Sequence, residues 1–372
     1  VTSFKHHECT TTLFLPAFAH DSFTCVCSTI RGNMIKVPRL RLPPLQAPSS
    51  AFDTPPQTLK GSGTVPKESR KPANSSLKDT VERAINTEQW QVNFEDIRLG
   101  PRIGRGSFAE VLKARWRDMD VAIKRYLWMN DEYGEEQLKE FSKEVSIMKR
   151  LRHPCIVQFL GACTQRPNLC LVMEFCSGGS LEKKLRDHSV RITRDLVLQM
   201  AIEIVQGMVY LHSQNPPIMH RDLKPANIFV EEGLHLKIGD LGLSTEVFHS
   251  RPITECGTLQ YMAPEILRGQ EADQKVDVYG FAMVLYEILM RFPPYSDLNI
   301  PALMAGLRAA YGGLRPSLEG CPFPEFIDIV KACWEDVPSK RPDFHSVLAS
   351  LLDLKRHGSR GGSRGSKGAK SR

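Results

Sequence analysis

Hydrophobic and polar positions alternate between residues 98 and 127, most clearly in the run Val121-Ala-Ile-Lys124. This period of two predicts β-strands, because successive side chains of a strand point to opposite faces of a sheet. Between residues 135 and 151, apolar side chains recur every three or four positions and the other side chains are mostly charged. That pattern predicts a helix with one buried face. The mostly apolar run from Leu169 to Phe175 predicts a further, buried strand.

Two later segments, Arg194–His212 and Val276–Leu289, are apolar around almost their whole circumference. A helix of this kind is expected in the centre of a domain, because it has no polar face to present to solvent. Strands in the first part of the chain and helices in the second indicate an α+β protein. We therefore expect a small antiparallel sheet lobe that carries one helix, followed by a larger and mainly helical lobe.

The two ends of the chain have a different composition. Residues 1–90 are rich in Pro, Ser and Thr and lack sustained periodicity, so we expect a largely disordered segment there. Residues 355–372 are rich in Gly, Ser, Arg and Lys and predict a solvated tail, although Arg-Gly-rich segments can also contact RNA. The folded domain is accordingly expected at 97–354, with a small lobe at 97–175 and a large lobe at 176–354.

The composition is compatible with a sizeable core, because hydrophobic residues make up 41% and charged residues 24% of the 372 positions. The net charge of +7 is unevenly distributed. Residues 91–354 have a small acidic excess, whereas residues 355–372 contain seven basic and no acidic side chains. The basic character of the whole chain therefore gives no argument for a nucleic-acid-binding face on the folded domain.

Ten cysteines are scattered without regular spacing. In a chain of this length that is typical of reduced, intracellular thiols, and we expect a cytoplasmic location. Cys25 and Cys27 could bind a metal together, but no second cysteine pair follows at ligand spacing. The short apolar run from Leu13 to Ala19 weakly resembles a targeting signal, and no segment approaches the roughly 18 apolar residues of a membrane span.

The segment from His220 to Asn227, His-Arg-Asp-Leu-Lys-Pro-Ala-Asn, carries the strongest chemical signal. Asp222 can accept a proton from a substrate hydroxyl, and Lys224 can neutralise charge on a phosphoryl group in transfer. Asn227 and the later Asp240 offer the hard oxygen ligands that magnesium prefers. These residue types fit phosphoryl transfer, which depends mostly on positioning and on charge neutralisation.

A glycine-rich run, Ile103-Gly-Arg-Gly-Ser-Phe-Ala-Glu-Val111, lies between two predicted strands. Glycines at 104 and 106 allow the backbone to approach phosphate oxygens closely. Alone, the run is also compatible with an ordinary hairpin or with a dinucleotide-binding unit, but the latter requires a helix next and an acidic residue about 20 positions later. A strand follows instead, and then Lys124 on another strand, which is similar to the nucleotide lid of protein kinases.

Lys124 lies in an apolar strand, and Glu144 lies on the inward flank of the helix predicted over 135–151. A lysine in this setting either reaches solvent at an edge or has an internal partner. Glu144 is the partner expected if the pair positions the α- and β-phosphates of a nucleotide. Two unrelated surface charges are the alternative.

Residues 103–354 resemble the protein-kinase catalytic domain throughout, and more narrowly the tyrosine-kinase-like group that includes Raf-type and mixed-lineage kinases. Besides the motifs above, the resemblance rests on Trp90, Phe94-Glu-Asp-Ile97, Lys113-Ala-Arg-Trp116, Leu151-Arg-His-Pro154, Leu160-Gly161, Met262-Ala-Pro-Glu265, Asp277-Val-Tyr-Gly280, Cys333-Trp334 and Lys340-Arg-Pro342. It implies a bilobal kinase fold, ATP and Mg²⁺ as cofactors, and proteins as substrates.

The resemblance also implies roles for individual residues. Met173 would be the gatekeeper, and the Glu174 carbonyl and the Cys176 amide would bind adenine. The residues implied to bind nucleotide are Ile103, Gly104, Arg105, Gly106, Ser107, Phe108, Val111, Ala122, Lys124, Glu144, Met173, Glu174, Cys176 and Phe229. A stacked spine would consist of Met148, Phe159, His220 and Leu241, anchored by Asp277, and Glu265 would pair with Arg341.

Regulation is implied by Arg221, which stands where such kinases bind a phosphorylated activation loop. In the segment from Asp240 to Glu265, Thr254 is the first candidate for phosphorylation and Ser250 the second. Thr258 is expected to act as a structural hydroxyl near Asp222. The activator would be an upstream kinase or a second copy of the same chain.

Three residues depart from the family pattern: Ala109 replaces the third glycine of the loop, Leu241 replaces phenylalanine after Asp240, and Cys155 replaces asparagine. None of the three changes removes a group that handles phosphate, metal or protons. The loop around Lys224 keeps the form found in Ser/Thr kinases. We therefore expect an active protein serine/threonine kinase. A pseudokinase scaffold with little turnover and an RNA-binding protein that uses the basic tail are the alternatives.

Overall fold

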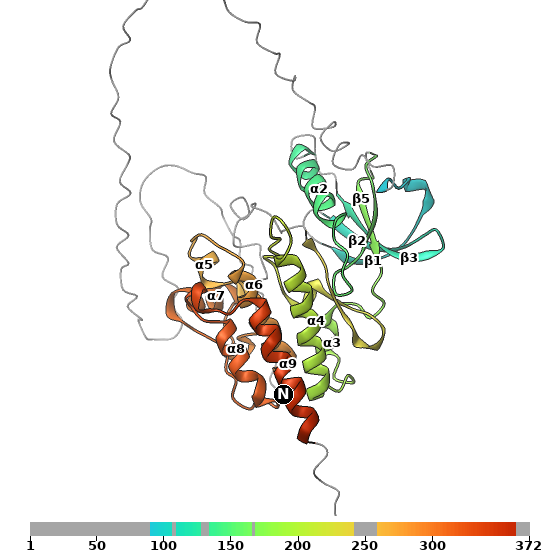
Figure 1. Cartoon of the computed structure of the whole chain (residues 1–372). Helices are drawn as coiled ribbons and strands as arrows, with labels where there is room; N and C mark the ends of the chain where they lie inside the picture. The colour runs from blue at the N-terminus through green and yellow to red at the C-terminus, as the bar shows by residue number, and fades with distance from the viewer. Residues whose placement is uncertain (1–89, 106–108, 128–133, 166–167, 242–258, 362–372) are drawn as a thin grey trace, which may run out of the picture. The chain divides into compact units, whose positions relative to one another are not determined.

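The computed structural model describes residues 90–105, 109–127, 134–165, 168–241 and 259–361 of the chain (Figure 1). The expectations for residues 1–89 and 362–372 fall outside these ranges. Within the described ranges, no helix is both long enough and apolar enough to cross a membrane.

Five antiparallel strands form the sheet of the small lobe, in the order β1-β2-β3-β5-β4 (Figure 1). They are β1 (Ile97–Arg105), β2 (Ala109–Trp116), β3 (Met119–Tyr126), β4 (Phe159–Cys163) and β5 (Cys170–Glu174). The tight turn between β2 and β3 consists of Arg117 and Asp118, which both have positive φ (48° and 61°). Turns of this kind match the right-handed twist of the strands that they join. The alternation is thus confirmed as strand structure over the described residues between 98 and 127.

One helix, α2 (Gly134–Met148), completes the small lobe. Its buried side chains include Leu138, Phe141, Val145 and Met148, which follow one another at three- and four-residue steps. This is the apolar face predicted from the sequence. Glu144 lies on the same side of the helix and is only 3% exposed. Burial of a carboxylate beside an apolar face requires a partner for its charge.

Helices dominate the large lobe (Figure 1). They are α3 (Leu181–Arg186), α4 (Arg194–His212), α5 (Pro264–Leu267), α6 (Lys275–Met290), α7 (Ala302–Gly312), α8 (Ile327–Cys333) and α9 (Phe344–Gly361). A two-stranded antiparallel sheet joins β6 (Ile228–Val230) to β7 (Leu236–Ile238). Every residue from Val276 to Leu289 in α6 is buried, as its sequence predicted, and α4 is likewise mostly buried. The α+β bilobal arrangement is confirmed.

The last helix differs from the expectation, because α9 continues to Gly361 and so runs beyond Leu354 into the predicted tail. Leu351 is fully buried, and Leu352 and Leu354 pack against the core of the lobe. Once a helix is held in this way, each further turn needs only backbone hydrogen bonds and tolerates polar side chains. Arg356 illustrates this, since its side chain is 72% exposed and pairs with Asp353 on the same helix.

A buried ion pair fastens α5 to the segment before α9. Arg341 donates from Nη1 and Nη2 to the two carboxylate oxygens of Glu265, at 2.6 and 2.8 Å. The side chains are 0% and 2% exposed. Arg341 also donates to the backbone carbonyls of Glu335 and Lys275. The pairing implied by the sequence is therefore present, and each charge has its hydrogen-bond partners.

Candidate active site

The hairpin formed by β6 and β7 brings Asn227 and Asp240 to one place. Asn227 directly precedes β6, and Asp240 lies two residues after β7 ends at Ile238. Ile228 is paired with Ile238 in the ladder, and the Gly239 amide donates to the Asn227 carbonyl at 2.9 Å. Because the strands are antiparallel, the residue before Ile228 and the residue after Ile238 lie close together. The two oxygen donors predicted from the sequence thus meet at the open end of this hairpin.

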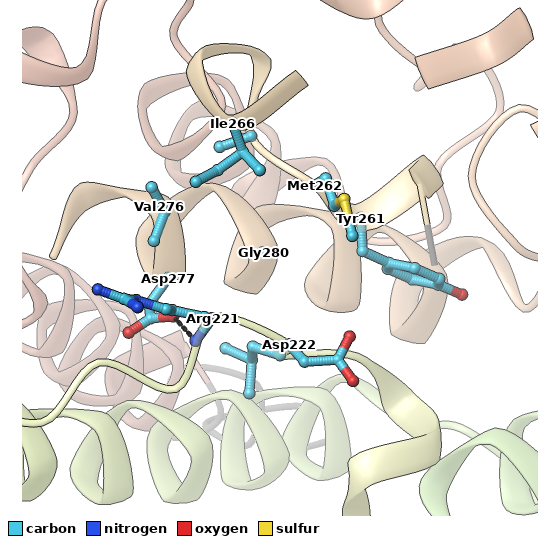
Figure 2. Close-up of a pocket in the computed structure, with 10 residues that line it drawn as sticks. Arg221, Asp222, Tyr261, Met262, Ile266, Val276, Asp277 and Gly280 are labelled. Atoms are coloured by element: carbon cyan, nitrogen blue, oxygen red, sulfur yellow. Dashed lines mark hydrogen bonds between the residues drawn. The ribbon is translucent and has the colours of Figure 1, made fainter. Parts of the chain in front are cut away.

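Asp277 of α6, which is 1% exposed, holds the loop that precedes Asn227 in place. Its carboxylate accepts hydrogen bonds from the backbone amides of His220 (2.8 Å) and Arg221 (2.7 Å). Figure 2 shows this carboxylate beside the Arg221 backbone. Arg221 has a φ of 64°, a left-handed conformation that costs a non-glycine residue free energy. The bonds to Asp277 offset that cost and hold the loop in one shape.

Asp222 lies at the centre of a small polar cluster. Lys224 Nζ is 2.6 Å from Asp222 Oδ2, and the Asn227 side-chain amide donates to the same oxygen at 2.8 Å. The Asn227 amide also donates to the Asp222 carbonyl at 2.9 Å. The Asp222 side chain is 9% exposed, so these contacts determine where its carboxylate points. The structure therefore brings together all three residues predicted to act in catalysis.

Lys124 joins the two lobes through its ammonium group. Nζ lies 2.9 and 3.0 Å from the two carboxylate oxygens of Glu144 in α2, and 2.8 Å from Asp240 Oδ1 in the large lobe. The positive charge of Lys124 lowers the pKa of Asp240 to about 2. Burial alone would lower the pKa of Lys124, but the attraction of Asp240 and Glu144 outweighs it and raises that pKa well above its usual value. Lys124 and Asp240 are therefore both charged at neutral pH.

The residues predicted to surround adenine come from both lobes. Val111 of β2 is paired with Lys124 of β3, and Ala122 of β3 is paired with Met173 of β5. Phe229 belongs to β6 of the large lobe, and its ring lies against Gly239, where an added Cβ would come within 2.7 Å of it. Gly239 therefore has to be a glycine for Phe229 to keep this position.

The end of β5 is held by Lys237 of the large lobe and by a backbone amide of the small lobe. The Glu174 carboxylate accepts two hydrogen bonds from Lys237 Nζ, at 2.8 and 2.7 Å, and one from the Gln158 amide at 2.6 Å. Cys176 follows two residues later and is 8% exposed. These contacts fix the position of Glu174, whose backbone carbonyl is predicted to bind adenine.

The glycine-rich run is described only in part. Ile103 is 41% exposed, Gly104 is paired with Val111, and Arg105 is paired with Glu110 at the end of the β1–β2 ladder. Gly106, Ser107 and Phe108 lie outside the described residues, as do Ser250, Thr254 and Thr258.

Comparison with known proteins adds an independent line of evidence. The family described as "Protein tyrosine and serine/threonine kinase" matches residues 97–351, which is more than half of the chain. The chain belongs to this family. The match ends within α9, close to the domain boundary predicted from the sequence.

Three similar kinases illustrate the relationship. The probable serine/threonine-protein kinase drkD of Dictyostelium discoideum is 40% identical over 261 residues, which cover 70% of this chain and 20% of that protein. The serine/threonine-protein kinases STY17 and CTR1 of Arabidopsis thaliana are 35% and 37% identical and share 72% and 73% of this chain. The similar regions cover 46% of STY17 and 33% of CTR1, so this chain spans less than half of each of these relatives.

The four residues of the spine expected for a kinase are all buried. Met148 and Phe159 of the small lobe and His220 and Leu241 of the large lobe are each at most 1% exposed, and Met148, Phe159 and Leu241 belong to one core cluster. His220 Nε2 lies 3.0 Å from the Gly239 carbonyl, which ties this core to the segment that carries Asp240. Leu241 thus fills its position as an apolar residue, despite the departure from phenylalanine.

No role was predicted for Tyr126 from the sequence. In the structure, the Tyr126 hydroxyl donates to Glu144 Oε2. A signal was present in the sequence, because residues two apart in a strand share a face and Tyr126 stands two positions after Lys124. It could not be interpreted without knowing that the helix carrying Glu144 covers this end of the strand.

Proposed function

We propose that this chain is a protein serine/threonine kinase that transfers the γ-phosphoryl group of ATP to hydroxyl groups of protein substrates. The observation that carries the proposal is the convergence on Asp222 Oδ2 of Lys224 Nζ at 2.6 Å and of the Asn227 amide at 2.8 Å. A lysine two residues after the acid, in contact with it, is the arrangement expected for a short serine or threonine side chain. The names of the similar proteins from Dictyostelium and Arabidopsis support the same specificity.

The proposed ATP site uses residues that the fold already holds in place. Val111 and Ala122 would cover one face of adenine and Phe229 the other, with Met173 behind the ring and the backbone of Glu174 and Cys176 at its edge. Lys124 is charged and held by Glu144, and it would bind the α- and β-phosphates. The glycine-rich run would bind the phosphates through its backbone. Its residues are Ile103, Gly104, Arg105, Gly106, Ser107 and Phe108.

The residues present fit a magnesium ion. Asn227 and Asp240 supply a hard amide oxygen and a carboxylate, and the low pKa of Asp240, about 2, keeps that carboxylate ionised. The Asn227 Nδ2 group is engaged with Asp222, which leaves the amide oxygen for the ion. When bound, Mg²⁺ neutralises charge on the ATP phosphates.

The transfer step is proposed to depend on the Asp222 cluster. The Asp222 carboxylate would orient the substrate hydroxyl and accept its proton as the hydroxyl oxygen bonds to the γ-phosphorus and the bond from that phosphorus to the departing ADP breaks. Lys224 would neutralise the negative charge that spreads over the transferring group. Asn227 holds the carboxylate through its amide, so the base is directed before substrate arrives.

The location proposed for this kinase is the cytoplasm. The six cysteines of the described segments, Cys155, Cys163, Cys170, Cys176, Cys321 and Cys333, all have free thiols, and five of them are buried. Buried free thiols are usual in reducing compartments, which supports the proposal.

Phosphoamino-acid analysis tests the proposed specificity. Incubation with radiolabelled ATP, Mg²⁺ and a generic protein substrate should give phosphoserine and phosphothreonine as the main products, because Lys224 and Asp222 hold the acceptor close. The same reaction with the magnesium chelated is the control and should give no product. A product dominated by phosphotyrosine would contradict the specificity, and no incorporation at all would favour a scaffold without turnover.

A second expectation concerns activation. The Nε atom of Arg221 is buried and has no hydrogen-bond partner among the described residues, and Arg221 directly precedes Asp222. We propose that it binds a phosphate on Thr254 or Ser250, placed there by an upstream kinase or by a second copy of this chain. A phosphate adds one to three charge-assisted hydrogen bonds, so a Thr254→Ala, Ser250→Ala double variant should lose about 10-fold or more in activity.

Mass spectrometry of the active enzyme should find the phosphate on one of these two residues. A Ser244→Ala, Thr245→Ala double variant is the matched control, because it removes two hydroxyls from the same segment, and it should keep its activity. Full activity of the Thr254→Ala, Ser250→Ala variant would refute this part of the proposal. Thr258 is kept unchanged in both variants, since it is proposed to act as a structural hydroxyl near Asp222.

A further inference from the structure

Tyr126 lies at the junction between the sheet and the helix of the small lobe. It is the last residue of β3 and stands two positions after Lys124. Side chains two apart in a strand point to the same face, and Tyr126 and Lys124 both reach α2. The Tyr126 side chain is part of the core, since the residue is only 5% exposed.

Two separate contacts join Tyr126 to α2. Its hydroxyl donates to Glu144 Oε2, and its ring meets the Phe141 ring edge-on, with centroids 5.3 Å apart and planes at 86°. Phe141 and Glu144 lie one turn apart on the same side of the helix. The Tyr126 amide also donates to the Leu169 carbonyl at 3.0 Å, which fixes the residue to the segment leading into β5. A single tyrosine therefore links the helix to β3 and to the residue before β5.

The role of the hydroxyl follows from the demands made on Lys124. The ammonium group of Lys124 is shared between two carboxylates, Glu144 and Asp240. In the proposed mechanism Lys124 also has to contact phosphates, which weakens its hold on Glu144. Glu144 is 3% exposed, and a buried carboxylate is strongly destabilised when its partners are lost. Tyr126 is a second donor to Glu144 that nucleotide does not draw away.

Titration does not interrupt this contact. Burial and the neighbouring charge of Glu144 raise the pKa of Tyr126 well above its usual value, so the hydroxyl keeps its proton at neutral pH. The hydroxyl therefore stays a hydrogen-bond donor to Glu144.

We propose that Tyr126 is a positioning residue for phosphoryl transfer: its hydroxyl holds the Glu144 carboxylate, and through Glu144 it keeps Lys124 directed at the nucleotide. The inference rests on the proposed kinase function. A residue that served only as packing would need the ring and not the hydroxyl. The contributions of the ring and of the hydroxyl can therefore be separated by one substitution.

The substitution Tyr126→Phe keeps the ring against Phe141 and removes the hydroxyl. We expect kcat/KM for ATP to fall about 10- to 100-fold, the usual effect of losing a hydrogen bond to a charged group. The KM for the protein substrate should stay the same. Tyr286→Phe is the matched control: it also removes a buried hydroxyl, one without a hydrogen-bond partner among the described residues, and should keep wild-type activity. Thermal unfolding of both variants reports whether they fold.

A double-mutant cycle with Glu144→Ala decides between positioning and packing. Without the acceptor, Tyr126→Phe should change kcat/KM by less than about 2-fold, which is the usual scatter for independent sites. An equal loss in both backgrounds, or no loss in the wild-type background, would overturn the proposal.

Direct titration with ATP repeats the cycle as a binding measurement and does not depend on turnover. Tyr126→Phe should weaken ATP binding when Glu144 is present and leave it unchanged when Glu144 is absent. Lack of turnover in the wild-type protein would contradict the proposed function alone. The titration would still support the role of Tyr126 or overturn it.

Discussion

Replacement of Asp222 by Asn should lower kcat by about 10²- to 10⁴-fold, the range over which a general base contributes to proton transfer. The substitution keeps the size of the side chain and an oxygen that can contact Lys224 Nζ and the Asn227 amide, but it replaces the basic carboxylate by an amide that cannot accept the proton. ATP affinity should change little, because Asp222 lies in the large-lobe loop and Lys124 holds the proposed phosphate site. Steady-state kinetics and an ATP titration measure the two quantities separately.

The matched control for this prediction is Asp195→Asn. Asp195 is in the first turn of α4 and its side chain is 93% exposed, so the same chemical change should leave kcat within the error of the measurement. Activity of Asp222→Asn close to that of the control would remove Asp222 from the mechanism. A loss of ATP affinity that matches the loss of kcat would mean that the loop, and not the base, had been disturbed.

Replacement of Arg341 by Met should lower the free energy of unfolding by about 3–5 kcal/mol, the usual result when one partner of a buried ion pair is removed. The expected cause is the carboxylate of Glu265, which would stay 2% exposed with its partner gone. Chemical denaturation followed by circular dichroism measures this change. The matched substitution Arg356→Met removes a pair whose side chains are 72% and 61% exposed, and should cost about 0–1 kcal/mol.

A double variant, Arg341→Met with Glu265→Met, separates the lost attraction from the unpaired charge. It should recover part of the stability, because no buried charge remains without a partner. Recovery should be incomplete, since Arg341 also donates to backbone carbonyls of Glu335 and Lys275. Equal stability losses for Arg341→Met and Arg356→Met would show that the buried pair contributes little.

The proposed mechanism makes Lys124 the connection between the lobes. Its contact with Asp240 spans 116 positions of the chain, whereas its contact with Glu144 spans 20. Three groups thus depend on one ammonium: a helix of the small lobe, a proposed metal ligand of the large lobe and, in the mechanism, the nucleotide. The Tyr126 hydroxyl gives Glu144 of α2 a second partner, so the position of this helix depends less on Lys124. The relative positions of Glu144 and Asp240 would then change less when nucleotide binds.

Much of the fold could be predicted because its signals are local. Strand alternation between residues 98 and 127, the apolar face of α2 and the apolar circumference of α4 and α6 follow from the periods of the two structures. The end of α9 could not be predicted in the same way, because Lys355 to Gly361 is helical only as a continuation of a helix held by Leu351. Composition alone does not show that attachment.

The sequence by itself determined the chemical groups of this protein and their local order. Asp222, Lys224 and Asn227 lie within one short loop, so their spacing is enough to place them together, and the glycines before Val111 are equally local. Which distant groups meet was expected from the sequence only through its resemblance to protein kinases, and the tertiary structure makes these contacts. The ladder of β6 and β7 brings Asp240 to Asn227. Helix α6 places Asp277 against the loop that carries Asp222, and α2 presents Glu144 to Tyr126. Such contacts depend on strand register and helix packing, which are set by the whole core and not by any single segment.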